Sequence, residues 1–387
     1  MLAAAIKRYP AVRVLIDLRV TVACLSLLFV LTFLGTMHQI DNGIYSAQKK
    51  YFESFFTLAA GFVPLPGAQL VLWVLCVNLA AATIYRFAYK ARRIGILIIH
   101  GGLFALFFGM FFTQYFAQES FLSLLEGEGG NVTTDYFDWE VAVWDPAGET
   151  RRVAAVDASE LADGNTVRID RYGVELRPQR YFAHAQAFSR SGGAPSPWIN
   201  GSGIDSLAEA RVSPDPQENF PGVLLTVAHR DGSAEVLLYG ADVAPASVPV
   251  AGGRLAVALR RKHYVMPLVV TLDDFRAEFH PNSDTPRSFE SDVILSTPQF
   301  TRSARISMNH PLRHAGYTFY QASYAIDATG RETSTLAVVH NRSRVVPYVG
   351  TLVVGLGLAV HFVQTLVLRR RRRPAPPGGS PERRTHA

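Results

Sequence analysis

Histidines inside apolar runs are the residues of this sequence with the clearest chemical potential. His100 follows the apolar run 96–99 and precedes two glycines, and His361 lies in the apolar run 358–362. An ionisable side chain in a membrane span is costly, so it usually faces a bundle interior or a functional site. Neutral imidazole is a common axial ligand of haem iron, and adjacent glycines would let a neighbouring helix or a flat cofactor approach. For His100 the two interpretations are a haem ligand and a structural histidine hydrogen-bonded to another helix.

The depths of the two histidines allow them to share one layer of the membrane. At about 1.5 Å per helical residue, His100 lies roughly 9 Å and His361 roughly 10 Å inside the ends of their spans. The charge pattern described below assigns both ends to the same side. A bis-histidine haem site within the chain is then geometrically allowed. Because histidines near an interface also serve as packing residues, we favour that interpretation from the residues alone.

The other histidines give weaker signals for a metal site. His310 and His314 have the spacing of a metal-binding pair only if they lie on a helix, and Pro311 and Gly316 would break that helix. We therefore predict a turn that leads into a strand at 317–322. The sequence has no nucleotide-binding glycine loop, no HExxH and no GxSxG, so the signals of common hydrolases and NTPases are missing.

Four apolar runs must position the two candidate histidines. They cover residues 20–37, 68–85, 94–116 and 346–368, and each is long enough to cross the hydrocarbon core as a helix. We predict an N-terminal membrane region at 1–116 with three spans, an exported domain at 117–345, a fourth span at 346–368, and a basic, disordered tail at 369–387. The first run lacks a small-residue cleavage pattern, so we expect it to be a retained span rather than a removed signal peptide.

Positive charges predict the orientation of these spans. Lys and Arg cluster before the first run, between the second and third runs at 86–93, and after the fourth run at 369–373. Short cytoplasmic loops carry such an excess, so both termini are expected in the cytoplasm and the domain outside. Much of the net charge of +6 lies in the arginine-rich tail. There it would bind anionic membrane lipid, and a role in binding nucleic acid is not indicated.

The exported region has the patterning of a mainly-β domain. Residues 139–144 alternate with period two, and residues 223–227 and 235–239 flank a turn in which Asp231-Gly232 would supply positive backbone angles. This pattern favours a β-sandwich or a related antiparallel fold. The chain has two cysteines, Cys24 and Cys76, and both lie in spans, so the domain must fold without disulfides. Aromatic residues at near-helical spacing over 45–62 predict an interfacial helix on the outer leaflet.

Several segments together resemble one family. Residues 306–312 (ISMNHPL) and 316–324 (GYTFYQASY) resemble the signature of the ResB (also CcsB) cytochrome c biogenesis proteins. Residues 286–293 (PRSFESDV), 93–96 (RIGI) leading into His100, and 125–131 (LEGEGGN) are also similar to that family. The layout of three spans, an exported domain and a final span is the same, so the resemblance covers nearly the whole chain.

The resemblance implies a role in attaching haem covalently to c-type apocytochromes outside the bacterial cytoplasmic membrane. In that family, this kind of chain is one half of a haem export and ligation complex, and a ResC or CcsA type protein with a tryptophan-rich motif is the other half. Only four dispersed tryptophans occur here, so the chain is similar to the ResB half alone and is not expected to be an enzyme by itself. Haem b would be bound in transit, with His100 matching the family's haem-ligating position and His361 as a second candidate.

Two other functions are compatible with the residues. An integral electron-transfer subunit would hold a haem between His100 and His361, and it would keep that haem in the isolated chain. A non-enzymatic scaffold or receptor would bind a protein through its β domain. Within the first interpretation, we expect segments 309–312 and 317–322 to dock the domain against the partner, with Tyr317, Phe319 and Tyr320 as contact surface.

Overall fold

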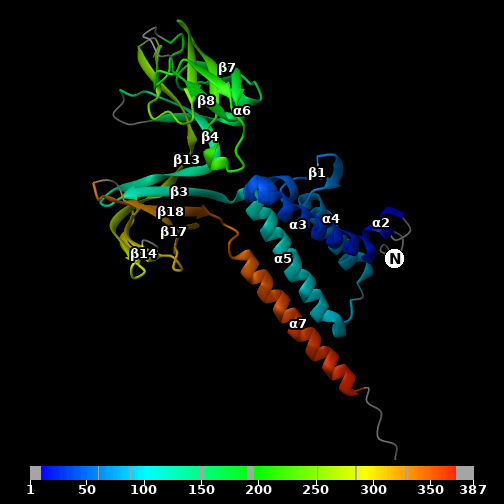
Figure 1. The fold of residues 1–387 in the computed structure, drawn as a ribbon. Helices are drawn as coiled ribbons and strands as arrows, with labels where there is room; N and C mark the ends of the chain where they lie inside the picture. Colours follow the sequence, from blue (N-terminus) through cyan, green and yellow to red (C-terminus); the bar gives the residue numbers. More distant parts are fainter. Residues whose placement is uncertain are drawn as a thin grey trace, which may run out of the picture. The chain divides into compact units, whose positions relative to one another are not determined.

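The computed structural model describes residues 10–59, 61–87, 89–147, 152–189, 196–250, 252–283, 286–326 and 329–371. The predicted disorder of the tail falls mostly on residues 372–387, which lie outside the described residues. The chain divides into two compact units. The membrane unit comprises Met1–Ile40, Ser46–Ala117 and Arg342–Ala387, and the β unit comprises Asp41–Tyr45 and Gln118–Asn341. Figure 1 shows both units and labels several of their helices and strands.

The described part of the membrane unit contains four helices long and apolar enough to cross a membrane, which confirms the predicted four spans. The helices are α3 (Leu18–Ala47), α4 (Ala68–Ala81), α5 (Ile94–Phe116) and α7 (Val346–Arg371), with a short α2 (Pro10–Leu15) before them. A π-helical turn, η2 (Ala82–Arg86), extends α4, and a 3-10 turn, η3 (Ala91–Arg93), precedes α5. Helix α3 continues well past the predicted end of its apolar run, because polar residues can continue a helix beyond the hydrocarbon core. Gly43, with φ +74°, interrupts it.

The predicted interfacial helix over 45–62 is correct only in part. After a π-helical turn, η1 (Gln48–Phe52), the chain forms a hairpin of β1 (Phe56–Ala59) and β2 (Val63–Pro66). Pro64 and Pro66 favour extended backbone and lack the N–H that a helix needs. Gly61, with φ +83°, supplies the turn.

Helices α5 and α7 pack closely along a seam of glycines, and Figure 1 shows them side by side. Gly95, Gly102 and Gly109 recur every seven residues of α5 and face α7. A Cβ atom on Gly95 would lie 2.5 Å from the backbone N of His361, and one on Gly109 would lie 2.9 Å from Cγ1 of Val346. Such distances are too short for a side chain, so glycine is what lets the two backbones approach.

Polar contacts join both ends of the α5–α7 pair. The hydroxyls of Thr113 and Ser343 are 2.9 Å apart at one end. At the other end, Gln364 Nε2 donates to the backbone oxygen of Ala91 at 3.0 Å. These bonds and the glycine seam fix the rotation of α5 about its own axis, and that rotation decides where its other side chains point.

The β unit is mainly antiparallel sheet, as predicted. A ten-stranded sheet contains β3 (Gln118–Leu125), β4 (Gly129–Trp144), β5 (Val153–Asp157), β12 (Ala246–Val250), β13 (Gly253–Phe279), β14 (Pro286–Ser296), β15 (Thr301–Ser307), β16 (Leu312–His314), β17 (Tyr317–Ile326) and β18 (Glu332–His340). A four-stranded sheet contains β6 (Val167–Ile169), β7 (Val174–Phe182), β10 (Gly222–His229) and β11 (Gly232–Tyr239). A small pair, β8 (Ala185–Phe188) and β9 (Ser206–Glu209), and the turns α6 (Ala158–Ala162) and η4 (Pro216–Glu218) complete the unit.

The predicted hairpin around Asp231-Gly232 is present with a different turn. His229 pairs with Gly232, so Arg230 and Asp231 form the two-residue loop. Of the two residues expected to have positive φ, only Gly232 does.

Two hydrophobic cores share the long strand β13. Its first part contributes Val257 and Leu259 to a core with the four-stranded sheet, and its later part contributes Val270 and Leu272 to a second core. The second core lies among the strands of the ten-stranded sheet, and the side chains of Ile306, Leu312, Phe319, Leu336 and Val338 also fill it. One strand therefore connects the two halves of the unit, and neither core needs a disulfide.

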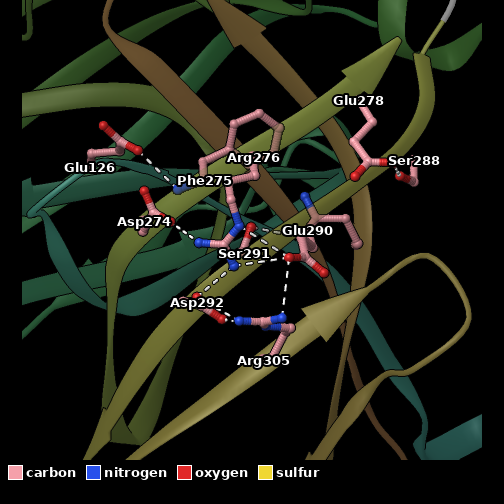
Figure 2. Close-up of polar contacts among 11 residues, drawn as sticks. Glu126, Asp274, Phe275, Arg276, Glu278, Ser288, Glu290, Ser291, Asp292 and Arg305 are labelled. Atoms are coloured by element: carbon pink, nitrogen blue, oxygen red, sulfur yellow. Dashed lines mark hydrogen bonds and ion pairs between the residues drawn. The ribbon is translucent and has the colours of Figure 1, made fainter. Parts of the chain in front are cut away.

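A charged cluster and a buried polar cluster lie on opposite faces of β14. On one face, Arg276 binds Asp274, Glu290 and Asp292, and Arg305 binds the last two (Figure 2). Hydrogen bonds from Arg305, together with the charge and hydrogen bond of Arg276, outweigh desolvation and hold the pKa of the Asp292 carboxyl below its usual value.

Because side chains alternate along a strand, Ser291 points to the other face, into the interior. Its hydroxyl donates to Gln321 Oε1 at 2.8 Å and lies 2.8 Å from the Ser334 hydroxyl. Gln321 Nε2 donates to the same Ser334 hydroxyl at 2.9 Å. The three buried side chains therefore satisfy one another, as buried polar groups must.

Candidate functional site

The site is built around His100, on the face of α5 opposite the glycine seam. His100 and Gly102 are two residues apart, which separates their directions by about 200° around the helix axis. Since Gly102 faces α7, the His100 side chain points away from α7. It points to the segment after α4, where its Nδ1 lies 2.8 Å from Thr83 Oγ1. The ring of Phe87 lies beside the imidazole, with 6.0 Å between ring centroids.

The residues that meet His100 are themselves held in place. Thr83 Oγ1 donates to the backbone oxygen of Leu79 at 2.8 Å, and the Tyr89 hydroxyl donates to the backbone oxygen of Thr83 at 2.6 Å. The rings of Phe87 and Tyr89 meet edge to face at 5.2 Å. Thr83 lies in the π-helical turn η2, a local irregularity that often occurs at functional sites.

An open face of α5 lies beside His100. A Cβ atom on Gly101 would meet no other atom within 4 Å, and Gly101 and Phe108 are exposed on this face. Leu97 and Phe104, on the same side of the helix, are partly exposed. Among the described residues, none forms a hydrogen bond to Nε2 of His100. One ring nitrogen of His100 is therefore hydrogen-bonded, the other has no partner among the described residues, and an apolar face lies beside the ring. A neutral imidazole nitrogen is a ligand that haem iron accepts in an axial position.

His361 is in a different environment. It lies on the seam face of α7, where its backbone N and Cα pack against Gly95. Its Nδ1 is buried without a hydrogen-bond partner among the described residues, as is Oε1 of Gln364 one turn later. The structure does not bring His100 and His361 together, because His361 packs against the glycine face of α5, whereas the His100 side chain points away from α7. The equal depth of the two histidines therefore does not produce the shared site that the sequence allowed.

His310 lies at the turn between β15 and β16, whereas His314 is the last residue of strand β16 and pairs with Tyr317, so the predicted turn is correct for His310 only. The backbone N of His310 donates to the Ser307 oxygen at 3.0 Å in the turn between β15 and β16, and the His314 ring meets Phe300 edge to face at 5.2 Å. In the part of the chain that the structure describes, no group of three or more His, Cys, Asp or Glu residues could hold a metal ion. The expected contact surface at 317–322 is wrong for one residue, since Phe319 is fully buried in the second core, whereas Tyr320 is exposed.

The sequence interpretation missed Thr83, Phe87 and Tyr89. A hydroxyl residue near the end of an apolar span, followed by three aromatic residues at 85, 87 and 89, was the available signal. That signal is weak, because threonine often bonds the carbonyl one turn earlier in a helix without any other role.

A family model and three known proteins are similar to parts of this chain. Residues 246–334, which run from β12 into β18, match the ResB-like family. The cytochrome c biogenesis protein CcsB of Synechococcus sp. (strain CC9605) is 34% identical over 91 residues, which are 24% of this chain and 21% of that protein. CcsB of Synechococcus sp. (strain RCC307) is 32% identical over 93 residues, with the same shares.

Protein NrfI of Wolinella succinogenes is 23% identical over 374 residues, which cover 86% of this chain and 33% of NrfI. These alignments span between about a fifth and a third of the relatives' own lengths. The matched family segment includes two of the motifs noted above, 306–312 and 316–324, and also 286–293. The resemblance to the ResB family is therefore confirmed, and the family match itself lies in residues 246–334.

Proposed function

We propose that this chain is the ResB-type subunit of a membrane complex that moves haem outward and supports its covalent attachment to c-type apocytochromes. The names of the CcsB relatives support a role in cytochrome c biogenesis. The observation that carries the haem part of the proposal is His100, a histidine within a membrane helix whose ring is oriented by Thr83 and Phe87 beside an open apolar face.

The positive charges that flank the helices support a place for this site in the bacterial cytoplasmic membrane. In the proposed orientation, the Lys and Arg residues at 86–93 lie in the cytoplasm and the β unit lies outside. His100 is then within two turns of the cytoplasmic end of α5. Haem is the cargo, and His100 would bind its iron through Nε2 while the complex receives it near the inner leaflet.

A separate membrane protein of the ResC or CcsA type is part of the proposal. This chain supplies one candidate ligand at the open face of α5, because His361 faces the α7 seam instead. A haem iron in transit has two axial positions, so the second ligand would come from the partner. This is also the reason why we do not favour a resident electron-transfer haem between His100 and His361.

The test is the haem content of the co-purified complex. In His100→Ala, we expect loss of most of the haem while the chain remains inserted and bound to its partner, because α5 keeps its glycine seam. His361→Ala is the matched control, since it removes the other membrane histidine, and it should retain haem. Added imidazole should restore haem to His100→Ala by filling the vacated position.

The haem absorbance per complex is measured after purification in detergent. It is compared among His100→Ala, His361→Ala and His100→Ala with added imidazole. Equal haem in His100→Ala and in the unchanged protein would refute the ligand role. A stable haem in this chain purified without its partner would instead support the electron-transfer alternative.

A further inference from the structure

We infer that Thr83 is a positioning residue that holds His100 in the tautomer with the proton on Nδ1 and so presents the Nε2 lone pair to the open face of α5. The assignment of the tautomer follows from the hydrogen bonds of the chain itself. Its consequence for haem rests on the proposed function.

The count of protons at Thr83 decides the tautomer. A threonine hydroxyl carries one hydrogen and can also accept. Its oxygen lies 2.8 Å from the backbone oxygen of Leu79, and a carbonyl oxygen can only accept, so the single hydroxyl hydrogen is used there. The bond of the same hydroxyl oxygen to Nδ1 of His100, also 2.8 Å long, must then have Nδ1–H as the donor. A neutral imidazole has one N–H, so Nε2 carries the lone pair.

The contacts around Thr83 disfavour the other tautomer of His100, which carries its proton on Nε2. For His100 to carry its proton on Nε2, the Thr83 hydroxyl would have to turn its hydrogen from Leu79 to Nδ1 and leave the Leu79 oxygen with one bond fewer. The Tyr89 hydroxyl holds the Thr83 backbone at 2.6 Å, and Phe87 packs against the imidazole. A β-branched side chain such as threonine has few χ1 rotamers in a helix. The acceptor is therefore fixed before any ligand arrives.

A histidine that binds a metal usually donates its other ring N–H to an oxygen, and this bond fixes the ring and raises the basicity of the ligating nitrogen. The Thr83–His100 pair has this arrangement in the chain alone. Loss of such an outer partner typically lowers metal affinity by about 10-fold to 100-fold. We expect a loss of that size in haem affinity when Thr83 can no longer accept.

Two substitutions separate the hydroxyl from the shape of the side chain. Thr83→Val keeps the branched shape and removes the acceptor, whereas Thr83→Ser keeps the hydroxyl. The first measurement is made without haem, on the full chain with ¹⁵N-labelled histidine in lipid bilayers. Solid-state NMR distinguishes the two tautomers, and comparison with His100→Ala identifies the signal of His100.

We expect Nδ1–H at His100 in the unchanged chain and in Thr83→Ser, and a mixture of tautomers in Thr83→Val. In the complex with the partner, haem titration should show affinity reduced about 10-fold to 100-fold in Thr83→Val and close to the unchanged value in Thr83→Ser. Predominant Nε2–H in the unchanged chain would overturn the inference, and this result does not depend on whether Thr83→Val folds. The same tautomer in Thr83→Val as in the unchanged chain would also overturn it.

The NMR result and the haem result test different claims. If His100→Ala binds haem as well as the unchanged complex, the proposed function of His100 fails, but the tautomer assignment still stands on the NMR spectrum. If His100→Ala loses haem and Thr83→Val does not, His100 remains the ligand and the positioning role of Thr83 is refuted.

Discussion

Two neighbouring glycines of α5 provide a matched test of how its helix packs. Gly102 faces α7, where an added Cβ would lie 2.6 Å from Val354 Cγ2, 2.8 Å from the Val354 backbone N and 2.9 Å from the Gly350 oxygen. Gly101 faces open space, where an added Cβ would meet nothing within 4 Å. We predict that Gly102→Ala destabilises the membrane unit and that Gly101→Ala does not.

The magnitude follows from comparison of the two variants. Each replacement gains about 1 kcal/mol of helix propensity, so this gain cancels in the difference. Forcing one carbon into a packed interface costs roughly 1–3 kcal/mol. Two of the three short contacts of Gly102 are to backbone atoms, which cannot turn aside as a side chain can. We therefore expect Gly102→Ala to be less stable than Gly101→Ala by about 2–3 kcal/mol, in the upper part of that range.

Unfolding of the full chain in mixed micelles, with increasing denaturing detergent and helix content followed by circular dichroism, measures this difference. The Gly101→Ala variant should unfold at or above the detergent concentration of the unchanged chain. If Gly102→Ala unfolds together with Gly101→Ala, then α5 does not pack on α7 through this face. The direction of His100 deduced from that packing would then be wrong as well.

Three further predictions concern the β unit and are measured on the full chain. Gln321→Leu should lower its free energy of unfolding by about 1–3 kcal/mol, because the buried Ser291 hydroxyl loses its acceptor; a neutral effect in denaturant titration would contradict the buried network. Ala315→Asn should raise thermal stability by about 0.5–1 kcal/mol, since Ala315 has φ +47° in the two-residue turn between β16 and β17 and asparagine tolerates that angle better. Burial, with the charge of Arg260, lowers the pKa of His263 from 6.5 to about 4. At His263 the unfolded chain therefore takes up a proton before the folded one as pH falls, so the contribution of this residue to stability is constant above pH 6.5 and decreases between pH 6.5 and 4. Because His263 is only half-buried, this loss should be about 1–2 kcal/mol and should be absent in His263→Gln, as thermal melts across that range would reveal.

The elements that the sequence predicted well are those whose ends coincide with a change of polarity. Helix α5 has the predicted bounds, since the apolar run begins after Arg93 and stops before Gln118. The end of α3 was missed, because a helix does not stop where its apolar residues stop. The β1–β2 hairpin was missed because its aromatic spacing also fits a helix, and only the prolines at 64 and 66 indicate extended backbone.

Of the residues in the candidate site, only His100 could be predicted from the sequence. His100 is conspicuous because it interrupts an apolar run, and this needs no knowledge of the fold. Its partner Thr83 is 17 residues away, and their contact depends on how η2 meets α5. The depth of His361 followed from counting residues at about 1.5 Å each, but its direction depends on which face of each helix packs, and counting along the axis does not contain that information.

The family match and the candidate site belong to different units of the chain. Residues 246–334 lie wholly in the β unit. Buried residues of the motifs, such as Ile306, Leu312 and Phe319, fill its second core. The family match therefore concerns a segment that builds a β core, and it does not include the candidate ligand in α5.

The haem proposal must then stand on the membrane unit by itself. The signature histidine His310 lies in a turn, so a motif that contains a histidine is not evidence for a haem site in the β unit. In contrast, His100 has an oriented ring, a fixed acceptor in Thr83 and an open face at Gly101. Haem binding should consequently depend on substitutions around α5 and η2. Substitutions in the second core should act through the stability of the β unit. A variant such as Phe319→Ala should therefore lose both stability and function. In contrast, Thr83→Val should remain folded and lose haem affinity.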